Sequence, residues 1–254
     1  MTSCRLVTAA TGLACALVMA SAFASDTGCS AQSGVGITPV VELYTSEGCS
    51  SCPPADRWAS GLGQQPPGPG TPVLEAFHVA YWDNLGWVDR FANPAHTDRQ
   101  RQIAQWNRQR GIYTPQVVLN GRDWPAWSSA GGTLPSASKP ASVSIRMLQL
   151  PDGRIEAMVI ARDKAAASWS AYWTVTEDGH ASKVKAGENA GEYLKHDHVV
   201  RQYTPVGNYS NEPGVARTLV LRPIAQTPGH ARHINLVIFD ERTGEILQAV
   251  SGAC

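Results

Sequence analysis

The sequence has no excess of charge of either sign. Its 254 residues include 21 Lys and Arg and 21 Asp and Glu, so the formal net charge is zero. Proteins that bind nucleic acid or anionic lipid present a positive field, and this balance therefore argues against both partners. The locally basic stretch at 98–110 is interpreted as the solvated face of a helix.

Several motifs of enzymes and metal sites are also absent. The chain has no Gly-x-Ser-x-Gly elbow, no phosphate-binding loop and no His-Glu-x-x-His pair, which argues against the common hydrolase classes. A closed zinc site needs four ligands, and a single C-x-x-C supplies only two of them. We therefore predict no resident metal and no cofactor.

Long apolar runs are missing, apart from one near the start of the chain. Arg5 precedes the mainly apolar stretch 6–20, and Ala22-Phe23-Ala24 has the small-x-small pattern of a signal-peptidase site. A membrane span needs about 20 residues, so residues 1–24 are predicted to be a cleaved secretory signal. We expect an exported protein, periplasmic or secreted, without a membrane span.

Cysteine is scarce enough for its pairing to be informative. Cys4 and Cys15 fall in the predicted signal, and the other four suit two disulfides in an oxidising compartment, with spacing that favours Cys29–Cys254 and Cys49–Cys52. In the chain-entropy model, a loop of about 226 residues contributes roughly 5 kcal/mol and a loop of about four roughly 2. The terminal pair is thus the predicted structural disulfide, and the close pair is a candidate for chemistry.

The first half of the chain alternates strands and helices. Strands are predicted at 37–46 and 72–82, with a short helix between them that starts at Pro53 or Pro54. This alternation predicts an α/β domain with a mostly parallel sheet at 36–128.

Local signals define the end of that domain. Thr97 and Gln100 form a capping box that predicts the start of the second helix, and Gly111 predicts its end. An Asn120-Gly121 type I′ turn then joins two further strands.

The pattern changes after a small, polar linker at 129–140. Short strands without a long helical pattern follow, which predicts a mostly antiparallel β-sandwich domain at 141–254. The expected fold is α+β overall.

The pair Cys49 and Cys52 follows the first predicted strand and precedes a helix. In open α/β sheets chemistry gathers beyond the carboxyl ends of the strands. A helix N-terminus also stabilises a thiolate, which lowers the cysteine pKa from about 8.5. We therefore assign Cys49 as the attacking thiolate and Cys52 as the resolving thiol.

These features resemble the thioredoxin superfamily. The strand–C-x-x-C–helix order is one element of the match, and "GIYTPQVVLNG" at 111–121 is the other. Thr114-Pro115 falls where thioredoxins carry a cis-proline that faces the cysteine pair. The resemblance implies that Pro115 folds back across the two sulfurs, which form an exposed, exchangeable couple acting on protein or small-molecule thiols, with a redox partner protein as a further expected partner.

More narrowly, the chain resembles a bacterial secreted family of unknown function, domain-of-unknown-function family 1223. The resembling segments are "VVELYTSEGCSSCPPAD", "FHVAYWDNLGWVDRFANP", "YTPQVVLNGR" and "GENAGEYLKHDHVVR". They occur in both halves of the chain, and the resemblance implies a thioredoxin-like fold.

Residues that follow the second predicted strand are candidates for the same rim. Asp83 is a candidate proton acceptor for Cys52, and Tyr81, Trp82, Trp87 and Gly48 are candidates for a substrate groove. The alternative interpretation places the tryptophans in the core and uses Asp83 to cap a turn.

The sequence departs from the thioredoxin pattern at three positions. The buried acid of thioredoxins is replaced by Leu43, and Glu42 points to the opposite face of the strand. Gly48 stands where an aromatic residue is usual. Pro53 biases Cys52 away from helical torsions, so the helix is predicted to start after the pair.

Two other functions stay open at this stage. One is Cu(I) handling, with His78 and the cluster His196-Asp197-His198 assisting the thiolates. The other is a non-catalytic binding or scaffold protein in which Cys49–Cys52 is structural. The favoured function is an exported thiol–disulfide oxidoreductase.

Overall fold

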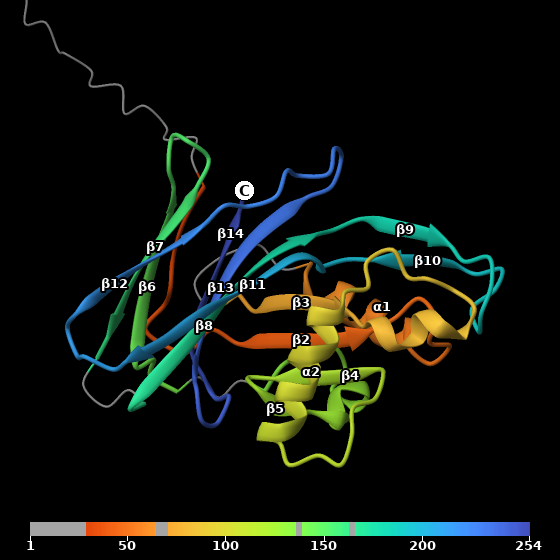
Figure 1. Cartoon of the computed structure of the whole chain (residues 1–254), viewed down its shortest axis with the longest axis horizontal. Helices are drawn as coiled ribbons and strands as arrows, with labels where there is room; N and C mark the ends of the chain where they lie inside the picture. The colour runs from red at the N-terminus through yellow and green to blue at the C-terminus, as the bar shows by residue number, and fades with distance from the viewer. Residues whose placement is uncertain (1–28, 65–70, 136–138, 163–165) are drawn as a thin grey trace, which may run out of the picture.

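A computed structural model describes residues 29–64, 71–135, 139–162 and 166–254 (Figure 1). The predicted signal at 1–24, with Cys4 and Cys15, lies outside these residues. Strands dominate the described chain, so the fold is α+β and rich in β-structure. The helical elements are α1 (Pro53–Leu62), η1 (Ala80–Leu85), α2 (Pro94–Trp106) and η2 (Pro125–Ser129). The strands are β1 (Ser30–Gln32), β2 (Val40–Thr45), β3 (Val73–His78), β4 (Gln116–Leu119), β5 (Arg122–Asp123), β6 (Val143–Gln149), β7 (Ile155–Ala161), β8 (Ser168–Glu177), β9 (His180–Lys183), β10 (Tyr193–His196), β11 (Val199–Ser210), β12 (Ala216–Leu221), β13 (Arg232–Asp240) and β14 (Ile246–Ala253).

One eight-stranded sheet runs through both halves of the chain. Its order is β14-β13-β8-β11-β3-β2-β4-β5, so strands from either side of the linker at 129–140 are neighbours. β2 and β3 are parallel, β11 joins β3 through the parallel pair Val199 and Ala76, and the other pairs are antiparallel. The expectation of a mostly parallel sheet at 36–128 is therefore wrong. Segment 107–115 returns the chain to the carboxyl end of β2, so β4 runs against β2.

A second sheet, ordered β1-β6-β7-β12, packs on β8, β13 and β14 at one end of the molecule (Figure 1). Apolar side chains from both sheets form one core, which includes Ile145, Val159, Trp173 and Leu236. The second half of the chain is thus layered like a sandwich, and one of its layers continues into β3 and β2. A disulfide between Cys29 and Cys254 joins the two ends of the described chain, as the spacing predicts.

The two α-helices pack near opposite faces of β2, which explains why all six of its residues are buried. Val41 and Leu43 belong to a core with Ala55 and Ala59 of α1. Tyr44, which has the opposite side-chain direction, packs in a core with Ile103 of α2. A strand covered on both faces loses the alternation of apolar and polar residues.

A buried charge on β2 is neutralised across the α2 interface. Both oxygens of the Glu42 carboxylate accept hydrogen bonds from Arg99, at 3.0 Å from Nε and 2.9 Å from Nη2. Glu42 does lie on the face opposite to Leu43. A buried carboxylate needs a counter-charge, and Arg99 provides it.

The boundaries of α2 differ from those predicted. The helix begins at Pro94, with the Asn93 side chain accepting a hydrogen bond from the Ala95 N–H at 2.9 Å. Thr97 is therefore not the N-cap, because Asn-Pro provides both a capping oxygen and a suitable first residue. The helix ends before Gly111, at Trp106, where the Asn107 amide donates to a last-turn carbonyl.

Two further boundaries can be compared with the sequence. The second strand ends at His78 instead of Trp82, and η1 follows it. The Asn120-Gly121 turn is confirmed, since both residues have positive φ, at 50° and 77°.

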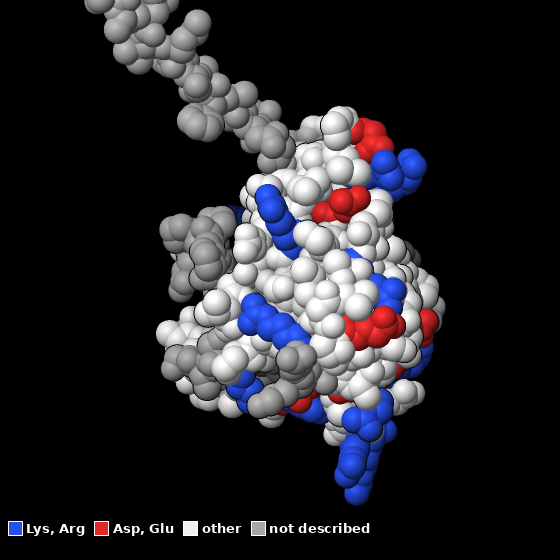
Figure 2. All heavy atoms as spheres, turned by 90° about the vertical axis from the view of Figure 1, so that its left-hand side faces the viewer, with Lys and Arg blue, Asp and Glu red and all other residues white. Residues whose placement is uncertain are grey.

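The surface carries charges of both signs. Figure 2 shows Lys, Arg, Asp and Glu scattered among uncharged residues on one face of the molecule, with basic side chains together at the lower tip. In the described part of the chain, no helix is long and apolar enough to cross a bilayer.

Candidate active site

The cysteine pair lies in the loop between β2 and α1, at the end of the sheet where β2 and β3 terminate. Cys49 and Cys52 form a disulfide, with 5.4 Å between their Cα atoms. The Cys52 carbonyl accepts hydrogen bonds from the Ala55 and Asp56 N–H groups, and α1 begins at Pro53, after the pair as predicted. The pair therefore stands at the positive end of the helix dipole.

Both cysteines are fully buried, at 0% exposure. The expectation of an exposed couple is wrong, because a distant segment covers the loop. The exposed residues between them are Ser50 and Ser51, and the Ser51 hydroxyl lies 3.4 Å from the Cys49 sulfur. Access to the sulfurs thus depends on the covering segment.

That segment, 184–192, connects β9 to β10, and we call it the covering loop. The Asn189 side-chain amide donates to two backbone carbonyls of the cysteine loop, those of Glu47 at 2.9 Å and Cys49 at 3.0 Å. The Glu188 carboxylate accepts from the Ser50 N–H and hydroxyl at 3.0 and 2.7 Å. These four hydrogen bonds hold the covering loop against the pair.

A tryptophan links the cysteine loop to the start of β4. The Trp82 indole N–H donates to the Thr114 hydroxyl at 2.8 Å, and a Cβ on Gly48 would lie 3.2 Å from the Trp82 Cβ. The Thr114–Pro115 peptide bond is cis. Gln116, the next residue, pairs with Tyr44 near the end of β2, so Thr114 and Pro115 lie at the same end of the sheet as the cysteines.

The other rim candidates also have structural partners. The Asp83 carboxylate accepts the Asp89 N–H at 3.1 Å and so caps a turn, and partial burial raises its pKa. The Trp87 indole N–H donates to Glu47 at 2.7 Å. Tyr81 packs at the edge of the core around Tyr44. The described hydrogen bonds of Asp83 do not include Cys52.

Directly beneath the cysteine loop lies a buried group of histidines and carboxylates. His78 is the last residue of β3, and its Nδ1 lies 2.6 Å from an oxygen of Asp89. The same carboxylate accepts the N–H groups of Glu47 and Phe91. Burial alone raises the pKa of Asp89, but His78 and these hydrogen bonds together lower it to about 2.

A second histidine, His196 at the end of β10, stands between two carboxylates. Its Nε2 is 3.4 Å from Glu47, and its Nδ1 is 3.8 Å from Asp56, which lies one turn after Cys52 on α1. Burial opposes the charged form of this imidazole, but the two carboxylates raise its pKa to about 9. The rings of His78 and His196 meet edge to face at 4.9 Å.

The family model that matches this chain is that of DUF1223, described as a protein of unknown function, over residues 40–238. The chain belongs to the DUF1223 family. A structural-genomics crystal structure of a protein from Agrobacterium tumefaciens is similar, with 24% identity, a TM-score of 0.59 and coverage of 85% of this chain and 94% of that one. HBP35 of Porphyromonas gingivalis is similar at 13% identity and a TM-score of 0.56, covering 86% and 76% of the two chains. No curated protein matches. These identities are below 25%, so the likeness concerns the fold alone.

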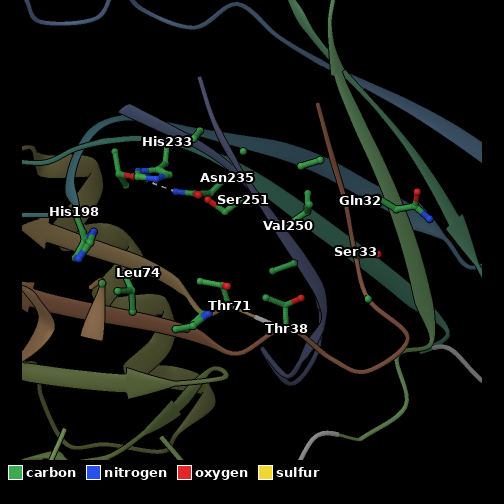
Figure 3. Close-up of a pocket in the computed structure, with 18 of the residues that line it drawn as sticks. Gln32, Ser33, Thr38, Thr71, Leu74, His198, His233, Asn235, Val250 and Ser251 are labelled. Carbon is green, nitrogen blue, oxygen red and sulfur yellow. Dashed lines mark hydrogen bonds between the residues drawn. The ribbon is translucent and has the colours of Figure 1, made fainter. Parts of the chain in front are cut away.

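A separate cavity of about 700 Å³ in this DUF1223 protein lies between the sheets (Figure 3). His198, His233 and Asn235 line it, with Thr38 on the opposite wall. The His198 imidazole lies 3.0 Å from Asp178, which lies 3.7 Å from His233. Neither cysteine of the pair lines this cavity. The sequence placed His196 and His198 in one candidate cluster, but His196 ends β10 whereas His198 lies in the bend before β11 with a φ of 57°, and the two face different sites.

Three of the buried acids near the cysteines were not among the predicted site residues. Glu47 and Asp56 flank the C-x-x-C, and Asp89 follows η1. A signal for Asp56 exists, since it lies four residues after Cys52 and therefore on the same side of the helix. Nothing in the sequence pairs Asp89 with His78, because their contact depends on how the chain turns after β3.

Proposed function

We propose that this DUF1223 protein is an exported thiol–disulfide oxidoreductase that acts through Cys49 and Cys52. The observation that carries the proposal is the four-residue disulfide at the start of α1, at the carboxyl end of two parallel strands. A helix N-terminus stabilises the thiolate that leaves when the disulfide opens. The finer fold that we propose is thioredoxin-like around β2, β3, β4, β5 and the two α-helices.

The sizes of the two disulfide loops support separate roles. Cys29 and Cys254 are 225 residues apart, whereas Cys49 and Cys52 are three apart. In the chain-entropy model the first contributes about 5 kcal/mol and the second about 2. The close pair is therefore a weak covalent restraint, which suits a bond that opens and closes during a reaction.

The proposed reaction transfers two electrons. A substrate thiolate attacks the Cys49 sulfur, and the Cys49–Cys52 bond breaks. A mixed disulfide then joins the substrate to Cys49, and Cys52 is released as a thiolate. A second substrate thiol loses its proton to solvent and attacks the substrate sulfur of the mixed disulfide, so that Cys49 leaves as a thiolate. The products are a substrate disulfide and the reduced pair. In the reverse direction Cys49 attacks a substrate disulfide and Cys52 resolves the intermediate.

Burial of the pair gives the covering loop a part in this proposal. A thiolate reaches Cys49 only after the contacts of Asn189 and Glu188 have separated. Trp82 and Thr114 form the opposite side of the opening, next to Pro115. We assign the substrate-binding surface to the space between these two sides.

The test is a redox titration of the full exported chain. Protein is equilibrated in glutathione and dithiothreitol buffers, free thiols are alkylated, and each cysteine is followed by peptide mass spectrometry. We expect Cys49 and Cys52 to be reduced together, with a midpoint reduction potential above about −300 mV. Structural disulfides of secreted proteins usually have potentials below this value.

Replacement variants complete the test. Cys49→Ser should abolish exchange with a dithiol peptide, and the double variant Cys29→Ser with Cys254→Ser should retain it. Persistence of the Cys49–Cys52 bond at lower potentials, or exchange that survives Cys49→Ser, would contradict the proposal.

The burial favours one alternative, a scaffold protein in which the pair is structural. Zero exposure and a covering loop with four hydrogen bonds are what such a disulfide would have. The same titration separates the two functions, because a structural disulfide stays oxidised throughout.

A further inference from the structure

We propose that Asp56, His78 and His196 form a binding site for a divalent transition metal, with Zn²⁺ as the ion that its donors favour. One ligand atom from each of these residues lies within 4.8 Å of the others. The three are 8%, 0% and 2% exposed, so the donors face the interior of the protein. This proposal does not depend on any reaction of the cysteine pair.

The strongest support is that several polar atoms in this group are buried without a hydrogen bond. They are His78 Nε2, both ring nitrogens of His196, and Glu47 Oε1. His196 Nε2 and Glu47 lie 3.4 Å apart as an ion pair, but none of the four atoms makes a hydrogen bond. A buried polar atom without a hydrogen bond costs about 1 to 3 kcal/mol, so such a group needs a physical reason. A bound cation would provide a partner for His78 Nε2 and for the His196 ring nitrogen nearer Asp56, and the other ring nitrogen would donate its N–H to Glu47.

The tautomer of His78 fits this role. Asp89 accepts hydrogen bonds from two backbone N–H groups, which indicates an ionised carboxylate. It therefore also accepts a hydrogen bond from the Nδ1–H of His78, at 2.6 Å. The lone pair is then on Nε2, the atom without a partner. Histidines that bind metals usually donate the other ring N–H to a carboxylate in this way. Asp89 is thus a positioning residue for His78.

The donor set indicates which ion would bind. Two imidazoles and a carboxylate are typical of zinc sites with three protein ligands, and Glu47, 3.4 Å from His196 Nε2, would orient that ring by accepting its other N–H. Zn²⁺ binds such donors at about 2.0 to 2.2 Å, which separates tetrahedral ligand atoms by about 3.4 Å. Donors up to 4.8 Å apart would have to approach one another by up to about 1.4 Å. Cu(I) prefers thiolates, and both nearby cysteines are held in a disulfide.

The fold holds these donors on separate, firmly packed elements. His78 ends β3 within the large sheet, Asp56 lies on α1 and accepts the Thr45 hydroxyl at 2.9 Å, and His196 ends β10. The ring of Phe91 packs on both histidines, at 5.2 and 5.8 Å. Asp56 has the largest exposure of the three, so it marks the side from which an ion would enter.

The test uses the oxidised full chain, stripped of metal with a chelator and dialysed. Titration calorimetry with zinc chloride should show one equivalent bound, and elemental analysis after desalting should recover it. Cobalt(II) should give visible absorption bands that Zn²⁺ displaces. A failure to bind zinc would overturn the proposal and leave a proton as the partner of His196.

Three variants identify the site. Asp56→Asn keeps the size of the side chain and should weaken zinc binding at least tenfold; Asp89→Asn, which acts through His78, should weaken it about 10- to 100-fold. His233→Asn is the matched control, because His233 lies in the other histidine group with Asp178. Circular dichroism confirms that each variant is folded.

The variants also provide the results that would refute the site. Zinc binding that survives Asp56→Asn and Asp89→Asn, or that is lost in His233→Asn, would place the ion elsewhere. The test does not use His78→Asn, because His78 is completely buried and its replacement risks unfolding the protein.

Discussion

Removal of each disulfide in turn should distinguish a structural bond from a reactive one by its effect on stability. The Cys29–Cys254 bond closes a loop of about 226 residues, and the chain-entropy model gives it about 5 kcal/mol. The Cys49–Cys52 bond closes a loop of four, for which the model gives about 2 kcal/mol. We therefore expect the double variant Cys29→Ala with Cys254→Ala to lose about 3 kcal/mol more than Cys49→Ala with Cys52→Ala.

The assay is urea unfolding of both double variants and the parent protein, followed by tryptophan fluorescence in buffer without reductant. Free energies are compared at the urea concentration where the parent is half unfolded, because removal of a long cross-link changes the denaturant slope. Reduced parent protein is the control, and it should match the sum of the two losses. A loss for the Cys49 and Cys52 variant that equals or exceeds the terminal one would refute the reasoning and favour the scaffold function.

Three further predictions concern buried polar groups. Asn189→Ala removes two hydrogen bonds from the cysteine loop, so a phosphine should reduce the disulfide at least several-fold faster. Lys185→Ala, also in the covering loop, is the control and should have no effect. Equal rates for Asn189→Ala and the parent would contradict the covering role. Burial and the Glu42 carboxylate raise the pKa of Glu75 from 4.5 to about 8, so the folded state holds a proton that the unfolded state has lost and stability should fall by a few kcal/mol between pH 4.5 and 8. Glu75→Gln should remove this fall in pH-dependent unfolding curves, and an unchanged curve would show that Glu75 is not its cause. Glu42→Gln leaves the Arg99 guanidinium buried without a counter-charge and should cost about 3 to 5 kcal/mol in urea unfolding, and a loss below about 1 kcal/mol would mean that water reaches Arg99.

The parts of the fold that the sequence predicts are those with local causes. β2 follows from a run of β-branched and aromatic residues, and α1 follows from prolines that suit a first turn. The Asn120-Gly121 turn requires two residues with positive φ, and both have it. In each case the residues that determine the structure are neighbours in the chain.

The eight-stranded sheet depends on contacts that no local pattern contains. β11 joins β3 through the pair Val199 and Ala76, which are more than a hundred positions apart. β3 is buried throughout, but only the first two residues of β11 are buried, so its sequence did not distinguish a separate sandwich from a shared sheet. The start of α2 was missed for another reason, since Asn93-Pro94 and Thr97 are both acceptable starts and only packing selects the first.

The burial of the cysteines has a similar origin. The covering loop reaches Cys49 through Asn189, 140 positions along the chain. Gly187 in this loop has a φ of 75°, and a Cβ there would lie 3.3 Å from the Trp87 Cβ, so a glycine is required both for the turn and for the close approach. A sequence pattern identifies such a turn, but it does not say which surface the turn covers.

The hairpin of β9 and β10 connects the two proposed sites, because it carries Asn189 above the disulfide and His196 beside Asp56. An ion bound by Asp56, His78 and His196 would tie this hairpin to α1 and β3, and the covering loop would open less often. Zinc should then slow the reduction of Cys49–Cys52 by a phosphine in the parent protein, and Asp56→Asn should remove this protection. Protection that persists in Asp56→Asn would come from zinc bound to the reductant or to the released thiolates. Equal rates with and without zinc in the parent would mean that the hairpin opens independently of the metal donors.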